Sequence, residues 1–274
     1  MFIETVKKNI KYTTVFGNDH FMIKRLLISL FIGFQSLSAQ DIEQATSELL
    51  YHFVRMEIFG ATNESDSMLL HSDHFNVKFS KLLSTNKSSI IYHFKPLKAL
   101  GLVIADSPDS AFRIYSWRVN PADSNTSYSS IFQWLQYDTL RTELKSISIE
   151  GQTGCYIKIH CITDELNTFY LAHYLIDNHY NQPSYQAIHV MDFERNKLNT
   201  EFKKIKTKNG LTHRLAFYYD PASIEETTWK ESELILYISD SLSINLPVVV
   251  NHGQVSNENI VYIYDGDYFI KPGN

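Results

Sequence analysis

The pattern that begins at Ser89 most strongly constrains how this chain can fold. From Ser89 to Ile270 the chain consists of short runs in which apolar and polar residues alternate, or in which β-branched and aromatic residues cluster; both are typical of β-strands. No helical pattern of about 10–15 residues separates these runs, and parallel strands would need such crossovers. We therefore predict a mainly antiparallel β-structure. The predicted strands are Ser89–Phe94, Leu102–Ala105, Phe112–Val119, Ser130–Tyr137, Glu143–Ile149, Cys155–Ile162, Thr168–Asp177, Tyr185–Phe193, Glu201–Lys206, Thr212–Tyr219, Glu233–Ile238, Asn245–Val250 and Asn259–Ile270.

Turn residues separate the predicted strands. Asn209-Gly210 and Asp265-Gly266 indicate hairpins, because both central positions of a type I′ turn need positive φ. Asp106–Asp109 reads Asp-Ser-Pro-Asp and predicts a four-residue turn. A meander of this kind can form a sandwich, a barrel or a propeller-like sheet, and the pattern does not choose between them.

Two amphipathic helices are predicted before the strands. Apolar residues recur at a period of about 3.6 over residues 41–59 and again over 64–83. The predicted fold class is therefore α+β, with two N-terminal helices followed by a mainly antiparallel β meander. We expect one domain over 40–274, helical over 41–84 and β-rich over 89–271.

The segment before the first helix resembles a secretory signal peptide. The basic pair Lys24-Arg25 precedes the apolar run Leu26–Phe34, and small residues follow over Ser36–Ala39. We predict a leader and signal peptide over residues 1–39, with the signal peptide itself at about 22–39. Its removal would expose Gln40 as the new N-terminus.

Export places the predicted domain in the periplasm or at the cell surface. Translation would start at Met1 or, as the signal-peptide pattern favours, at Met22. The apolar run is shorter than the roughly 20 residues that a membrane span needs, so we expect no membrane span after cleavage.

The charge of the predicted mature chain argues against a nucleic-acid partner. Removal of residues 1–39 takes away five basic and two acidic side chains, which leaves 20 basic against 28 acidic and a net charge of −8. Nucleic-acid binding needs a clustered basic face. The one short basic run, residues 203–208, reads better as the arm of a solvated hairpin.

The two cysteines of the chain, Cys155 and Cys161, are not expected to form a disulfide. Both belong to one predicted strand, and six residues at about 3.3 Å each separate them by near 20 Å. A disulfide requires Cα atoms within about 7 Å. We predict two free thiols that pack as small apolar side chains.

Two residue groups suggest metal binding only weakly. His71 and His74 would share one helix face, but no third ligand follows at a defined spacing. Asp265-Gly266-Asp267 lacks the further oxygen ligands of a calcium loop, and a hairpin turn explains it. We predict no metal and no cofactor.

The carboxylates offer an alternative hypothesis, a cell-envelope hydrolase. Sequence alone identifies no catalytic residue, since no nucleophile motif is present. Neighbouring residues of a strand point to opposite faces, so a general acid and base would have to come from separate strands. The carboxylates considered are Asp164, Glu165, Glu225, Glu226 and Asp267.

Aromatic residues in the predicted strands suggest a binding surface. A row of exposed tyrosines is a stacking platform for sugars or for a protein partner, although tyrosine also suits a half-buried strand without any ligand. The candidate binding residues are Tyr170, Tyr174, Tyr262, Tyr264, Tyr268 and Trp117.

A short pattern, Asp followed by Ser or Thr and then an apolar residue, occurs four times. It resembles the general O-glycosylation acceptor that Bacteroidota use on exported proteins. The alternative is turn and cap chemistry, which also favours Asp-Ser. The candidate acceptors are Ser67, Ser110, Thr139 and Ser241.

The segment Ser107–Trp117 reads SPDSAFRIYSW and, with the signal peptide, resembles a hallmark of uncharacterised exported proteins of Bacteroidota. The resemblance covers residues 97–119 and the signal peptide. It implies export, a helical start and a β-rich remainder, and it brings no activity.

The leading hypothesis is thus a non-catalytic binding module of the periplasm or cell surface. Its expected partner is a glycan or another envelope protein. The hydrolase is the alternative, and a structural subunit of an envelope assembly is a third hypothesis.

Overall fold

The computed structural model describes most of the chain beyond the predicted signal peptide. The described residues are 41–119, 127–164, 167–178, 182–224 and 234–273. The predictions for residues 1–39, Glu165, Glu225 and Glu226 therefore lie outside the described residues. The chain divides into two units, Met1–Glu43 and Gln44–Asn274, and the account below concerns the second.

Two helices form the first layer of this unit. The first helix runs to residue 61, and a short turn leads into α2 (Ser65–Thr85). Each buries side chains three and four residues apart, Leu49, Phe53 and Met56 on the first helix and Phe75 and Phe79 on α2, which is the spacing of one helix face. Both predicted helices are confirmed. No helix in the described chain is long and apolar enough to span a bilayer.

The predicted strand Ser89–Phe94 is wrong. The chain forms instead a 3₁₀ turn, η1 (Lys87–Ile90), and a short helix, α3 (Lys95–Ala99). The Asn86 side chain caps η1 by accepting the Ser88 N–H at 2.9 Å, and Ser89 Oγ donates to the Asn86 carbonyl at 2.6 Å. These local bonds satisfy backbone groups that a strand would have paired with a neighbour.

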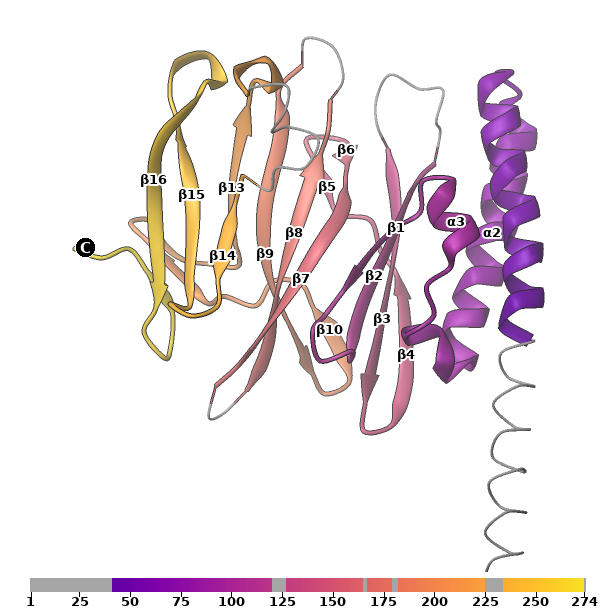
Figure 1. The fold of residues 1–274 in the computed structure, drawn as a ribbon, viewed down its shortest axis with the longest axis horizontal. Coiled ribbons are helices and arrows are strands. Elements are labelled where there is room, and N and C mark those ends of the chain that lie inside the picture. The colour runs from indigo at the N-terminus through magenta and orange to yellow at the C-terminus, as the bar shows by residue number, and fades with distance from the viewer. Residues whose placement is uncertain (1–40, 120–126, 165–166, 179–181, 225–233, 274) are drawn as a thin grey trace, which may run out of the picture. The chain divides into compact units, whose positions relative to one another are not determined.

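A four-stranded antiparallel sheet lies against the helices (Figure 1). The aromatic rings Trp117 and Tyr115 point from it toward α2, with ring centroids 5.1 Å from Phe75 and Phe79 respectively. Its strands, in spatial order, are β1 (Val103–Asp106), β2 (Phe112–Arg118), β3 (Tyr128–Gln136) and β4 (Thr139–Leu144).

The central sheet is built on three long antiparallel strands. They are β7 (Cys155–Thr163), β8 (Thr168–Ile176) and β9 (Ser184–Glu194). The first half of β9 pairs with β13 (Arg214–Tyr219), and its last residues pair with β10 (Lys197–Asn199). A separate small hairpin, β5 (Ser148–Ile149) and β6 (Gln152–Thr153), precedes β7.

A six-stranded sheet completes the unit. All of its pairs are antiparallel except β11 with β17, which run parallel. In spatial order the strands are β12 (Gly210–Thr212), β11 (Ile205–Thr207), β17 (Phe269–Ile270), β16 (Val255–Tyr264), β15 (Ser243–Val249) and β14 (Leu236–Ile238).

The central sheet is buried on both faces. One hydrophobic core joins it to the four-stranded sheet, through residues such as Phe112 and Tyr156, and a second joins it to the six-stranded sheet, through residues such as Ile188 and Ile244. Figure 1 shows the resulting order of layers from the helices to β16. The predicted α+β class and the mainly antiparallel pairing are confirmed, and the architecture is a stack of sheets.

The free state of both cysteines is confirmed. Cys155 and Cys161 lie on one strand, β7, as predicted. A β-bulge between Tyr156 and Lys158 interrupts the strict alternation that the sequence suggested. Burial raises the pKa of the Cys155 thiol to about 12, so this thiol stays protonated and unreactive at neutral pH.

Candidate functional site

The predicted aromatic platform is not an exposed surface. Trp117, Tyr170, Tyr174 and Tyr264 are buried, with exposed fractions of 9% or less. Tyr262 and Tyr268 are half-buried. The expectation of exposure is corrected for a physical reason: these strands are covered by a second sheet or by helices, so aromatic rings that would face solvent in a single sheet fill a core instead.

The hallmark segment Ser107–Trp117 comprises the β1–β2 turn and most of β2. The Asp109 carboxylate accepts hydrogen bonds from the Ser107 hydroxyl, from the Ala111 N–H at 3.1 Å and from the Tyr170 hydroxyl at 2.8 Å. Since Tyr170 belongs to β8, these bonds attach the β1–β2 turn to the central sheet. The segment therefore has a structural role that its sequence alone did not reveal.

Of the carboxylates considered for hydrolysis, Asp164 and Asp267 are among the described residues, and they have different hydrogen-bond partners. Asp164 accepts a hydrogen bond from the Tyr264 hydroxyl at 2.7 Å and lies 3.6 Å from Lys204 Nζ. Asp267 is exposed in the β16–β17 turn, where the Asp265 carboxylate accepts its backbone N–H at 2.9 Å. Neither carboxylate lines a cavity described below.

The predicted histidine pair lies at the contact between the two helices. His71 Nδ1 is 3.0 Å from His52 Nδ1, and the His74 ring stacks on the His52 ring at 5.2 Å. Burial lowers the pKa of His52 and of His71. Within the described residues, no three His, Cys, Asp or Glu side chains are placed to hold a metal ion.

The four Asp-Ser/Thr sites lie in turns, at a strand start and at a helix start. Ser110 and Ser241 are exposed in the β1–β2 and β14–β15 turns, Thr139 is exposed as the first residue of β4, and Ser67 is half-exposed in the first turn of α2. The side chains are therefore reachable, and the turn chemistry that favours Asp-Ser is also present.

A polar depression of about 480 Å³ lies where the small β5–β6 hairpin meets the central sheet. It has the size of a small-ligand site. We call it the Tyr218 depression. Its lining residues are Glu150, Gln152, Asn178, Gln182, Pro183 and Tyr218.

A chain of hydrogen bonds fixes the amide wall of the Tyr218 depression. Asn178 Nδ2 donates to the Pro183 carbonyl at 2.8 Å and to Gln152 Oε1 at 3.2 Å. Gln152 Nε2 in turn donates to Gln182 Oε1 at 3.5 Å. Asn178 is buried, whereas Gln182 is exposed, so the chain anchors solvent-facing amides to the protein interior.

Tyr218 supplies the aromatic side of the depression. Tyr218 is 39% exposed, and its ring lies 4.9 Å, centroid to centroid, from the ring of buried Tyr185, its cross-strand partner on β9. Burial, and then a hydrogen bond with Glu150, raise the pKa of Tyr218. The hydroxyl is therefore protonated at neutral pH, and the partly exposed ring packs against a buried one.

The sequence pattern did not indicate this site. Tyr218 lies in a strand that the sequence predicted, but its neighbours in the depression come from two loops distant in sequence. The local sequence signal for any part of it is Gly151, which follows Glu150 in a turn where both residues have positive φ, 52° and 87°.

Comparisons with known proteins give no relative to set beside this geometry: no family model, no curated protein and no solved structure matches the chain.

Proposed function

We propose that this protein is a non-catalytic binding module that takes a neutral glycan at the Tyr218 depression. The observation that carries the proposal is the exposed Tyr218 ring beside a hydrogen-bonded wall of Gln152, Asn178 and Gln182. A sugar ring has an apolar C–H face and a rim of hydroxyls. An open aromatic face suits the first, and amides, which both donate and accept, suit the second.

The chemistry of the lining favours a neutral ligand over an acidic one. Glu150 is the one charged residue among the six that line the depression, and the predicted mature chain has a net charge of −8. An acidic polysaccharide would meet like charge on approach. The neutral hydroxyls of an uncharged sugar can instead form hydrogen bonds with the side-chain amides of Gln152, Asn178 and Gln182.

The same lining supports binding over hydrolysis. Glycoside hydrolysis uses two carboxylates on either side of the scissile bond. Among the described residues that line the depression, Glu150 is the sole carboxylate, and it is bonded to Tyr218.

The test is saturation-transfer NMR on the full chain with cellohexaose, xylohexaose, mannohexaose and chitohexaose. We expect at least one of these to receive saturation at its C–H protons. Tyr218→Ala should weaken that binding about tenfold, because the stacking face is lost. Tyr137→Ala is the matched control, since Tyr137 is 85% exposed in the β3–β4 turn, away from the depression.

Two results would overturn the glycan proposal. The first is the absence of saturation transfer to all four oligosaccharides. The second is equal binding by the wild type and by Tyr218→Ala. If an envelope protein binds Tyr218→Ala as tightly as it binds the wild type, that result would support a protein partner in place of a glycan.

We further propose that the module is exported to the periplasm or cell surface and that it resembles exported Bacteroidota proteins in carrying O-linked sugar at Ser67, Ser110, Thr139 or Ser241. Exposure of Ser110, Thr139 and Ser241 supports the modification. The measurement is the intact mass of protein recovered from its own cell envelope. A chain starting at Gln40 with sugar-sized additions is expected, whereas an unmodified chain starting at Met1 or Met22 would contradict export and modification together.

A further inference from the structure

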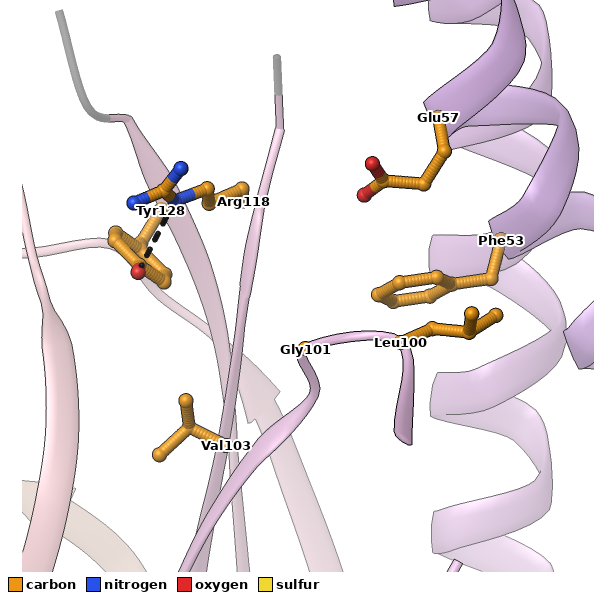
Figure 2. A pocket seen from close by; sticks show the side chains of 7 residues that line it. All are labelled: Phe53, Glu57, Leu100, Gly101, Val103, Arg118 and Tyr128. Carbon is orange, nitrogen blue, oxygen red and sulfur yellow. Dashed lines mark hydrogen bonds between the residues drawn. The ribbon is translucent and has the colours of Figure 1, made fainter. Parts of the chain in front are cut away.

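A second cavity, of about 400 Å³, lies between the first helix and the end of the four-stranded sheet. We call it the Glu57 pocket. It is separate from the Tyr218 depression, with which it shares no residue. Its lining residues are Phe53, Glu57, Leu100, Gly101, Val103, Arg118 and Tyr128 (Figure 2).

Glu57 is the unusual feature of this pocket. Figure 2 shows its carboxylate leaving the helix and pointing toward the side where Arg118 and Tyr128 lie. The residue is half-buried, and burial raises the pKa of its carboxyl group, which the positive charge of Arg118 partly offsets. Among the described residues, no hydrogen bond or ion pair reaches this carboxylate. A partly desolvated carboxylate without a partner is costly to the protein alone.

Arg118 and Tyr128 form the opposite, cationic side. They are direct cross-strand partners at the ends of β2 and β3, and Arg118 Nε donates to the Tyr128 hydroxyl at 3.4 Å. That hydrogen bond, opposed by burial, raises the pKa of Arg118. A guanidinium holds a carboxylate through parallel N–H···O bonds, and a phenol hydroxyl can donate one more hydrogen bond.

Apolar groups lie between the two charged sides. Phe53 is buried, Val103 is half-buried, and Leu100 is 37% exposed at the pocket mouth. Figure 2 shows Phe53 and Leu100 stacked below Glu57, with Gly101 between them and Val103. The pocket thus combines one negative group, one positive group and an apolar surface, within the size range of small-molecule sites, about 300–1,000 Å³.

We propose that the Glu57 pocket binds a small zwitterion with an apolar body, such as a free amino acid. Its ammonium group pairs with the Glu57 carboxylate, its acidic group with Arg118 and Tyr128, and its aliphatic part contacts Phe53, Leu100 and Val103. The ligand supplies the partner that Glu57 lacks within the described residues. Glycan binding at the Tyr218 depression neither requires nor excludes this second site.

The test is calorimetric titration of the full chain with four probes at up to about 10 mM, which covers dissociation constants near 1 mM. Leucine and 6-aminohexanoate carry both charges at different separations. N-acetylleucine lacks the ammonium group, and leucinamide lacks the carboxylate. We expect at least one zwitterion to bind and both singly charged analogues to bind at least about tenfold more weakly.

Glu57→Gln separates a true site from nonspecific binding. Because no described side chain pairs with Glu57, this variant should fold as well as the wild type. It should bind the zwitterion about tenfold more weakly and no longer prefer leucine to N-acetylleucine. Glu258→Gln, at an exposed position of β16, is the control and should bind as the wild type does.

Leu100→Trp offers an independent variant that fills the mouth of the pocket, and we expect it to abolish zwitterion binding. The proposal is overturned if neither zwitterion binds, or if Glu57→Gln binds them as tightly as the wild type does. Oligosaccharide binding, measured on the same variants, should be unchanged, which keeps the two sites distinguishable.

Discussion

The two faces of the central sheet are both buried but carry different side chains. The face toward the four-stranded sheet carries Tyr156, Tyr170, Tyr174 and His189. The face toward the six-stranded sheet, here called the aliphatic face, carries mainly aliphatic residues such as Leu171, Ile188 and Val190, with Phe169 among them. Hydrogen bonds of buried tyrosine hydroxyls join residues of the first face, and the second face is packed mainly by aliphatic side chains. Burial alone therefore does not describe how each core is specified.

Pairing of polar atoms distinguishes the first face. The Tyr156 hydroxyl lies 3.1 Å from His189 Nδ1, and the Tyr174 hydroxyl donates to the Ile147 carbonyl at 2.6 Å. On the second face His173 Nε2 is buried with no hydrogen-bond partner among the described residues; His189 Nε2 on the first face is also unpaired, but its Nδ1 has the Tyr156 hydroxyl as a partner. The stability of the aromatic face therefore depends on hydrogen-bond geometry, whereas that of the aliphatic face depends on how completely side chains fill the core.

The largest expected effect comes from removing volume on the aliphatic face. Phe169 is fully buried there and contacts the rings of Phe202 and Tyr264, with centroids 6.1 and 5.6 Å away. We expect Phe169→Ala to lower the free energy of unfolding by about 3–5 kcal/mol, through lost burial and the cavity left behind. Urea denaturation measures this, and a loss below about 1 kcal/mol would show that the two sheets close up over the site.

Acid should destabilise the protein through one histidine on each face. Burial lowers the pKa of His173 and of His189 to about 3, against 6.5 for an exposed histidine. Below pH 6.5 each of the two histidines therefore binds a proton in the unfolded chain but stays neutral in the folded protein. The free energy of unfolding therefore decreases as the pH is lowered from 6.5 toward 3. At pH 5 the loss is about 2 kcal/mol per histidine.

The histidine variants make that loss measurable by difference. His173→Leu should remove about 2 kcal/mol of the stability difference between pH 8 and pH 5, as about 1.4 kcal/mol per pH unit predicts. His93→Leu, at an exposed position, is the control. An unchanged difference in His173→Leu would mean that His173 is protonated in the folded protein.

At pH 8, replacing His189 and replacing His173 should change the free energy of unfolding in opposite directions. His189→Phe leaves the Tyr156 hydroxyl without its partner in the core, so we expect a loss of about 1–2 kcal/mol. His173→Leu removes a buried nitrogen that has no partner among the described residues, so stability should stay equal or rise. Equal losses in both variants would remove the distinction between the faces.

The smallest effect is expected for Tyr156→Phe, about 1 kcal/mol, since only one hydroxyl is deleted and the ring stays packed. Combined with His189→Phe in a double-mutant cycle, it should cost less than the two single losses together, because both variants break the same bond. Additive losses would contradict the Tyr156–His189 bond.

Much of the secondary structure was predictable from local patterns, and the misses have local causes. The Asn209-Gly210 signal lies at a hairpin, but Thr207 pairs with Gly210, so the turn residues are Lys208 and Asn209. Gly210, with φ of 111°, belongs to the strand. Paired positive φ values, the mark of a type I′ turn, occur instead at residues without an Asn-Gly or Asp-Gly signal.

In the Tyr137-Asp138 turn, pairing of the flanking strands overrides the local preference of the turn residues. Both residues have positive φ, 48° and 58°, although tyrosine gains nothing from that conformation. The register of β3 against β4, with Gln136 opposite Thr139, leaves two residues to close the hairpin. Pairing of the flanking strands thus imposed a turn that local propensity would not choose.

The sequence by itself determined the order of the elements: two helices with a 3.6-residue period, then strands with a period of two, joined without crossover helices. The tertiary structure alone decided what covers each strand face. A period of two states that side chains alternate, but it does not state whether solvent or another sheet lies opposite, so Tyr170 and Tyr174 became core residues. For the same reason the two candidate sites, each assembled from segments distant in sequence, appeared only when the layers were stacked.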